Sequence, residues 1–248
     1  MIKIKLTPNY TGIEITGDYD DFDELYDAIT NVLGSPSKDA REDQMQLHTL
    51  GFCYDLRHAK QGDRGIFVED NGLRDFKIEQ FGIKGATKTN TYYTFYYIIP
   101  EILIDIIILN YFINKIEKGY PNDYLKHRRK HFNNDINIIR CFTTKVVASF
   151  KEILTPIRYN KIIDGINDCY LRPHLFCRQY FEDVVVTFLN CTKNQRVKKF
   201  MNFANKIYNF YDYLEYEEIC KQVEKYAKEN NCSIDDIGIC DYPTSIDW

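Results

Sequence analysis

The amino-acid sequence predicts an α+β fold: an N-terminal antiparallel sheet with two covering helices, followed by a helical C-terminal bundle. Residues 2–16 alternate apolar and polar side chains, which is typical of a hairpin with one buried face. Further β-forming residues recur as far as Pro100, and almost every later segment carries apolar residues at helical spacing. Strands that come first and helices that come afterwards do not fit an alternating βαβ fold.

The composition is that of a folded protein. The chain has 248 residues, of which 44% are hydrophobic and 27% charged, with a formal net charge of -4. These values exclude collagen, disordered tails and histone-like polycations. Because no repeat and no Pro/Gly/Ser-rich linker divides the chain, we expect a sheet-bearing part over residues 1–100 and a helical part over residues 101–248, packed as one compact body.

Capping residues define the two helices that are expected to cover the sheet. The first begins after Asp18, whose carboxylate can accept hydrogen bonds from free backbone N–H groups, and it ends at Gly34. The second runs from about Glu42 to Lys60, and Gly62 is suited to its C-terminal cap.

The next segments predict further strands. Asn71-Gly72 favours a type I′ turn, so residues 66–68 and 73–78 are predicted to pair as a hairpin. The Thr- and Tyr-rich segment 87–97 predicts another strand, which stops at Pro100.

The long apolar run at residues 92–112 is interrupted by Pro100, Glu101 and Asp105. These interruptions do not fit an uncharged membrane span, so we expect a buried strand that leads into a buried helix. Apolar stripes at 136–154, 197–211 and 216–227 predict later helices.

The eight cysteines include no Cys-x-x-Cys pair, and we interpret them as reduced thiols. Residues 1–6 alternate apolar and charged side chains, so we expect no secretory signal and a cytoplasmic location.

The densest polar cluster lies at the end of the second predicted helix. Tyr54, Arg57 and His58 share one helix face, and Asp55 and Asp63 are near enough to orient His58 or to pair with Arg57. A histidine can move a proton, an arginine can hold an anionic group and a tyrosine can donate to a developing charge. Tyr54, Asp55, Arg57 and His58 are therefore candidate catalytic residues. The alternative, which we favour, is that these groups satisfy one another and hold the helix to the sheet.

His48 lies on the apolar face of the same predicted helix. We expect it to be a core histidine with its polar atoms satisfied.

Charge is unevenly distributed along the sequence. Residues 122–200 contain 15 basic and 7 acidic residues, a net charge of +8, which leaves -12 for the remainder. Two basic clusters supply the candidate anion-binding residues Lys126, Arg128, Arg129, Lys130, Lys193, Arg196 and Lys199. They indicate either a phosphate-binding or nucleic-acid-binding face or, as we favour, a solvated face matched by the acidic helix at 212–229.

No cofactor and no metal site are expected. His127 and His131 have the i, i+4 spacing of metal ligands, but the neighbouring lysines and arginines would repel a cation. The sequence contains no Gly-rich phosphate loop and no Gly-x-Ser-x-Gly motif.

Three segments carry a resemblance to a known family: TPNYTGI to GDYD at 7–20, ELYDAI at 24–29, and YDLRHA with QGDR at 54–64. In these segments the chain resembles a family of uncharacterised proteins from low-GC Gram-positive bacteria, most clearly over its first third. The resemblance implies a bacterial, intracellular origin and supplies no catalytic residues to transfer. It directs attention to the cluster around Arg57 and His58.

The leading hypothesis is a cytoplasmic, non-enzymatic module that binds a protein partner or an anionic ligand and self-associates. The first alternative is a metal-independent hydrolase or ribonuclease that uses Tyr54, Arg57 and His58. The second is an RNA- or DNA-binding protein that uses the basic helices. Association with a membrane is not expected.

Overall fold

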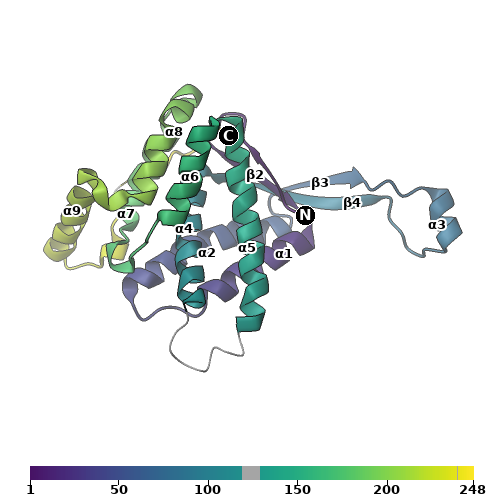
Figure 1. Cartoon of the computed structure of the whole chain (residues 1–248), viewed down its shortest axis with the longest axis horizontal. Helices are drawn as coiled ribbons and strands as arrows, with labels where there is room; N and C mark the ends of the chain where they lie inside the picture. Colours follow the sequence, from purple (N-terminus) through teal and green to yellow (C-terminus); the bar gives the residue numbers. More distant parts are fainter. Residues whose placement is uncertain (119–128, 239) are drawn as a thin grey trace.

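The computed structural model describes residues 1–118, 129–238 and 240–248 (Figure 1). The α+β prediction is confirmed, because a four-stranded antiparallel sheet is followed by a series of helices. The strands are β1 (Lys3–Leu6), β2 (Gly12–Gly17), β3 (Gly65–Asp70) and β4 (Thr89–Ile98). Their order in the sheet is β1-β2-β4-β3.

The two predicted covering helices are α1 (Tyr19–Leu33) and α2 (Ala40–Lys60), which pack on each other and against the sheet. Asp18 caps α1 by accepting a hydrogen bond from the backbone N–H of Asp21, at 2.8 Å. Gly34 follows α1 with φ +74°, and Gly62 follows α2 with φ +87°. Both glycines therefore adopt the left-handed backbone region that favours glycine after a helix.

The predicted turn at Asn71-Gly72 is wrong. β3 pairs with β4, with Asp70 opposite Thr89, and the intervening chain contains the short helix α3 (Asp75–Phe81). A type I′ turn needs positive φ at both central residues, but of this pair only Gly72 has it, at +78°. Asn71 instead uses its side chain to donate to Thr87 O, at 2.9 Å, which closes the base of a longer connection.

The β3–α3–β4 segment projects from the body of the protein as an arm (Figure 1). We define the arm as residues 65–94. None of its residues is buried, whereas the next residue of β4, Phe95, belongs to the core. The sheet therefore changes from a core element into an exposed ribbon at this point.

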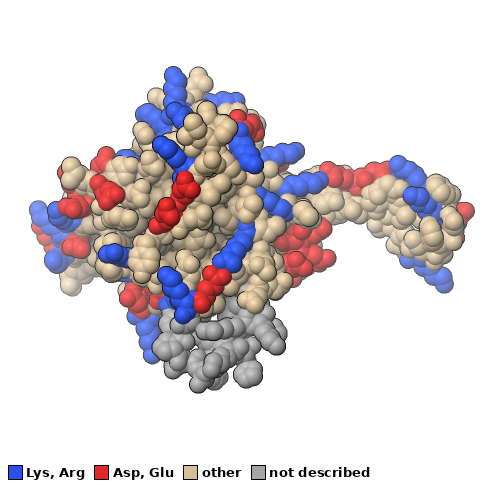
Figure 2. All heavy atoms as spheres, in the orientation of Figure 1, with Lys and Arg blue, Asp and Glu red and all other residues tan. Residues whose placement is uncertain are grey.

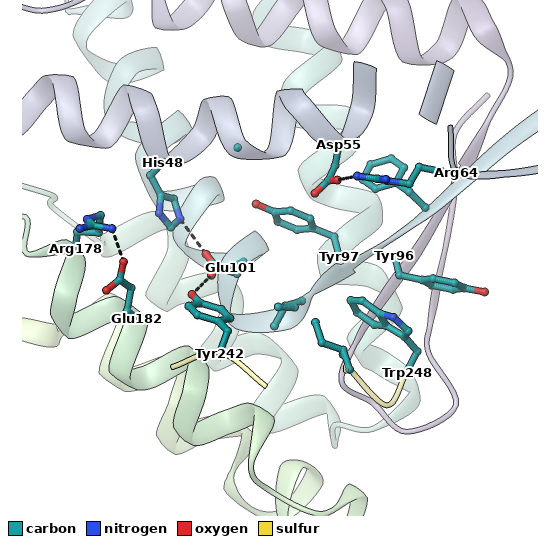
Figure 3. Close-up of a pocket in the computed structure, with 14 residues that line it drawn as sticks. His48, Asp55, Arg64, Tyr96, Tyr97, Glu101, Arg178, Glu182, Tyr242 and Trp248 are labelled. Atoms are coloured by element: carbon teal, nitrogen blue, oxygen red, sulfur yellow. Dashed lines mark hydrogen bonds and ion pairs between the residues drawn. The ribbon is translucent and has the colours of Figure 1, made fainter. Parts of the chain in front are cut away.

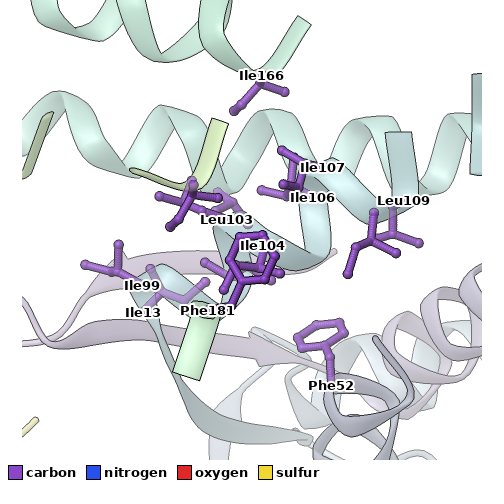
Figure 4. Close-up of a cluster of buried hydrophobic side chains, with 14 of the residues drawn as sticks. Ile13, Phe52, Ile99, Leu103, Ile104, Ile106, Ile107, Leu109, Ile166 and Phe181 are labelled. Carbon is purple, nitrogen blue, oxygen red and sulfur yellow. The ribbon is translucent and has the colours of Figure 1, made fainter. Parts of the chain in front are cut away.

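The predicted buried helix after Pro100 is confirmed as α4 (Ile99–Glu117), which is buried on nearly all sides (Figure 4). The other helices of the bundle are α5 (Arg129–Ser149), α6 (Pro156–Asp168), α7 (Arg178–Leu189), α8 (Lys193–Tyr208) and α9 (Leu214–Asn230). One apolar cluster extends from Ile13 of the sheet to Tyr216 of α9, with α4 at its centre. Within the described ranges, no helix has both the length and the apolar character needed to cross a membrane.

The segment after α9 returns to the sheet. Asn9 donates from its side-chain amide to Asp247 Oδ1, at 2.8 Å, and the Thr11 hydroxyl donates to the backbone carbonyl of Asp247. These contacts hold Asp247 beside the connection between β1 and β2, more than 230 positions away in the sequence.

Candidate functional site

The predicted cluster at the end of α2 does come together. The ring centroids of Tyr54 and His58 lie 4.2 Å apart, and the Arg57 guanidinium lies over the Tyr54 ring, 5.5 Å from its centroid. His58 Nδ1 lies 2.7 Å from Asp63 Oδ2, whereas Asp55 pairs with Arg64, also at 2.7 Å. Asp63, rather than Asp55, therefore orients His58.

This cluster lies at the surface. Tyr54 is 53% exposed, and the His58 side chain is 23% exposed. Of the four predicted catalytic residues, only Asp55 reaches the large pocket described next.

A pocket of about 610 Å³ opens between α2, β4, the starts of α4 and α7, and the C-terminal segment (Figure 3). Its volume falls in the range of ligand pockets, roughly 300 to 1,000 Å³. The side chains that matter most for its chemistry are His48, Asp55, Tyr96, Glu101, Arg178 and Trp248.

His48 occupies one end of this pocket and faces two carboxylates on α4. Its Nε2 lies 3.2 Å from Glu101 Oε2 and 3.9 Å from Asp105 Oδ1, contacts that are ionic rather than well-directed hydrogen bonds. Tyr242 donates its hydroxyl to Glu101, at 2.9 Å, and Tyr97 donates to Asp105, at 3.0 Å. The expected core histidine is thus only partly buried, with 14% of its side chain exposed, and it belongs to a charged network that borders the pocket.

Burial and charge set the protonation of this network. Burial lowers the pKa of His48, but the contact with Glu101 and the charge of Asp105 outweigh it and raise that pKa to about 9. Burial raises the pKa of Asp105 to about 7, against the opposing effect of His48. Burial also acts to raise the pKa of Glu101, but the His48 contact leaves it lowered overall. At neutral pH His48 is therefore protonated and Glu101 ionised at the pocket wall, while Asp105, which is fully buried and does not line the pocket, titrates near neutrality.

Two aromatic rings form the other end of the pocket (Figure 3). Trp248 stacks on Tyr96 with the ring centroids 5.4 Å apart and an interplanar angle of 27°. Gly12 permits this position, because an added Cβ would lie 2.6 Å from Trp248 Cζ3 and 2.3 Å from the carbonyl oxygen of Tyr97. Because Gly12 of β2 has no side chain, the indole of Trp248 can lie directly against the sheet.

The charged groups that line the pocket are paired. Asp55 pairs with Arg64, and His48 pairs with Glu101. Glu182 accepts a hydrogen bond from Arg178, at 2.6 Å. These pairs balance three positive charges with three negative charges while His48 is protonated.

The first predicted basic cluster lies outside the part of the chain that the structure describes, apart from the backbone of Arg129 and Lys130. Lys126, His127 and Arg128 lie outside the described residues, and so do the side chains of Arg129 and Lys130. The backbone of Arg129 begins α5.

The second predicted basic cluster does not act as a unit. Arg196 is only 6% exposed, and its guanidinium donates to the backbone carbonyls of Asn9, Phe188 and Leu189. This interior position does not fit the expected anion-binding role of Arg196. Lys199 is exposed, and Lys193 lies over the Tyr10 ring, 4.6 Å from its centroid. On the face shown in Figure 2, basic and acidic side chains are interspersed.

Of the principal pocket residues, the sequence singles out His48 and Asp55 but not Glu101, Tyr242 or Trp248. Glu101 and Asp105 stand in the sequence as interruptions of an apolar run, yet their i, i+4 spacing places both on one side of a buried helix. Two charged residues in such an apolar helix indicate a polar site inside the protein, because a buried charge needs a partner. No local sequence pattern marks Tyr242 or Trp248 as pocket residues.

Comparison with known proteins identifies a family but no activity. No curated protein and no solved structure matches the chain. A family model described as a domain of unknown function (DUF6904) matches residues 2–248, nearly the whole chain. This match confirms the expected kinship with uncharacterised proteins. The chain therefore belongs to the DUF6904 family, whose function is unknown.

Proposed function

We propose that this protein is a non-enzymatic binding module whose pocket holds a small, uncharged molecule with a flat ring, of the size and chemistry of a nucleoside. The observation that carries the proposal is the composition of the pocket. A stacked aromatic pair, Trp248 on Tyr96, forms one end, and the buried polar network around His48 and Glu101 forms the other.

The aromatic end supports a flat ring as the ligand. An indole offers a large, rigid face, and a stacked base contributes about 1 to 3 kcal/mol to binding in proteins that bind single-stranded nucleic acids. The pocket volume of about 610 Å³ is sufficient for a molecule of nucleoside size.

The charge balance supports an uncharged ligand. Arg64, Arg178 and His48 each have a carboxylate partner, so an anion would have to compete with a carboxylate that is already in place. The pocket thus favours a neutral ligand over the anionic ligand expected from the sequence. Glu101 and His48 offer polar contacts to the edge of such a ring.

Intrinsic fluorescence tests the proposal directly, because Trp248 is the single tryptophan of the chain. We expect adenosine, guanosine, cytidine or uridine to quench the emission of Trp248 in a saturable manner at micromolar concentrations. The matching nucleoside monophosphate is expected to bind at least tenfold more weakly, because its phosphate adds charge to a balanced pocket.

Calorimetry with two variants supplies the control. Trp248→Ala is expected to weaken binding of the quenching nucleoside by about tenfold or more, through loss of stacking. Tyr226→Ala removes a 54% exposed aromatic ring from α9, outside the pocket lining, and is expected to leave binding unchanged. The proposal fails if no nucleoside changes the emission at millimolar concentration, or if the two variants bind equally well.

A second candidate function is metal-independent cleavage of RNA at the surface cluster of α2. The observation in its favour is the His58 Nδ1–Asp63 contact of 2.7 Å, because an oriented imidazole leaves its other nitrogen for proton transfer. Arg57 and Tyr54 stand beside this pair, where they can contact a phosphate and a leaving oxygen.

Cleavage of a fluorescently labelled single-stranded RNA in the presence of a chelator tests this candidate. Removal of a general acid or base costs roughly 100-fold to 10,000-fold in rate, so His58→Ala is expected to lose at least 100-fold. His174→Ala, at another exposed histidine, is the matched control and is expected to retain full activity. Equal rates for the two variants would exclude the candidate.

Binding of RNA or DNA through the basic helices stays a prediction, as do a cytoplasmic location and an origin in low-GC Gram-positive bacteria. Lys193 and Lys199 are the members of the predicted set that are described and exposed. If they bind nucleic acid, the affinity falls steeply with salt concentration.

A further inference from the structure

Several large apolar side chains are exposed together on the arm. The side chains of Ile66, Val68, Phe76, Phe81 and Ile83 are between 42% and 69% exposed. Scattered apolar residues are ordinary on a protein surface, but a concentration of them on one projecting element marks an interaction surface. The arm extends away from the body (Figure 1), and these five side chains stay exposed although Lys3 of β1 reaches the arm to pair with Glu69, at 3.8 Å.

The edge of the sheet on this arm is also unprotected. β3 is an edge strand, and within the described part of the chain no strand lies on its outer side. Natural edge strands are usually shielded by charged side chains, above all lysine, by proline or by a bulge. The β3 sequence GIFVED contains neither lysine nor proline, its charged residues Glu69 and Asp70 lie only at its end, and its pairing with β4 runs in continuous register. The outward N–H and C=O groups of β3 are therefore open to another strand.

We propose that β3 pairs in antiparallel orientation with β3 of a second copy of this chain, forming a two-fold symmetric dimer with one continuous sheet. The pattern of β3 is self-complementary about Phe67. Antiparallel pairing there sets Phe67 against Phe67 of the second copy, and Ile66 against its Val68. The same register sets Arg64 against Asp70 of the second copy at both ends.

The charges favour a second copy over a nucleic acid or a strongly charged partner. A basic residue precedes β3, and two acidic residues end it, so only antiparallel self-pairing brings these opposite charges together. Within one chain Arg64 pairs with Asp55, at 2.7 Å, and Asp70 pairs with Arg74, at 2.9 Å. The Arg64 and Asp70 side chains are 40% and 60% exposed, so both pairs lie where they can exchange partners with a second copy. The arm as a whole carries four basic and four acidic residues, a balance unlike that of a surface built for phosphates.

Sedimentation velocity of the full chain tests the proposal. We expect a species of twice the 29.5 kDa chain mass at concentrations of 10 to 100 µM. Val68→Lys places a charge at the centre of the pairing and is expected to weaken the dimer by at least 30-fold. Ile157→Lys, at a residue of α6 that is 74% exposed, is the matched control and is expected to remain dimeric.

Charge exchange tests the register. Arg64→Glu and Asp70→Arg are each expected to weaken the dimer about tenfold, and the double variant is expected to recover to within about threefold of the wild type. Hydrogen exchange adds a readout without substitution: the amides of residues 65–70 should exchange more slowly at 100 µM than at 1 µM protein. A wild-type chain that stays monomeric at 100 µM would overturn the proposal. So would a dimer that Val68→Lys leaves intact, because another surface would then hold it.

Discussion

Replacement of His48 by glutamine is expected to lower the free energy of unfolding by about 3 kcal/mol near pH 6, with a much smaller loss near pH 10. The His48 side chain is 14% exposed, and it is ion-paired with Glu101. Loss of the imidazolium leaves the Glu101 carboxylate, whose side chain is only 15% exposed, without its cation, and removal of one partner of such an enclosed ion pair is strongly destabilising.

The pH dependence follows from the direction of the pKa shift. The pKa of His48 is raised from 6.5 to about 9, so the folded state binds this proton more tightly than the unfolded state. The stabilisation is complete below about pH 6.5 and is lost as the pH rises through about 9. The pKa of Asp105 is raised to about 7 from 3.8, which adds a loss of stability between about pH 4 and pH 7. Both groups make the folded protein more stable on the acidic side.

The titration of Cys177 changes stability with pH in the opposite direction. The free energy of unfolding must therefore be compared between the wild type and a variant at each pH. The neighbouring Cys220 thiol lowers the pKa of Cys177 from 9 to about 7, which adds stability as the pH rises between these two values. Urea unfolding of the wild type and of His48→Gln at three pH values removes this shared contribution by subtraction. His58→Gln, at an exposed ion pair, should change stability by less than about 1 kcal/mol. If the difference between the wild type and His48→Gln is constant from pH 6 to pH 10, the network does not have the proposed charge.

Substitution of Phe52 by alanine is expected to cost about 3 to 5 kcal/mol. Phe52 on α2 is fully buried. Its ring centroid lies 5.9 Å from that of Phe95, 5.0 Å from that of Tyr97 and 5.5 Å from that of Phe142. It thus joins α2, the sheet and α5, and its removal leaves a space that three separate elements border.

Denaturant unfolding measures this loss, with Leu47→Ala as the control on the same helix. Leu47 is 60% exposed, so its truncation should change stability by less than about 0.5 kcal/mol. Because Tyr97 lines the pocket, Phe52→Ala should also shift the emission of Trp248 in the folded state. Equal stability of the two variants would mean that the core around Phe52 repacks without a cavity.

Local sequence signals determined most of the secondary structure. Asp18 and Gly34 bound α1 where a capping carboxylate and a glycine with positive φ are expected. The helical face shared by Tyr54 and His58 brought their rings together as predicted, because residues four apart on a helix are neighbours whatever the rest of the chain does.

The error at Asn71-Gly72 shows the limit of such signals. A two-residue turn motif describes only the chain next to it, whereas the partner of β3 was decided by the whole β4 strand. When β3 pairs with β4, it extends the sheet that β2 and β4 already form. The side-chain packing along this sheet outweighs the turn preference of the Asn71-Gly72 dipeptide.

The candidate site depended on tertiary structure almost completely. His48, Glu101, Tyr242 and Trp248 come from α2, α4 and the C-terminal segment, and no periodicity relates them. The sequence by itself determined the α+β class, the capped helices and the buried character of α4, since each follows from interactions between near neighbours. Tertiary structure alone decided the pocket, the pairing of its charges and the exposure of the arm. Those features depend on which distant segments exclude water together, and that is a property of the packed chain rather than of any segment in it.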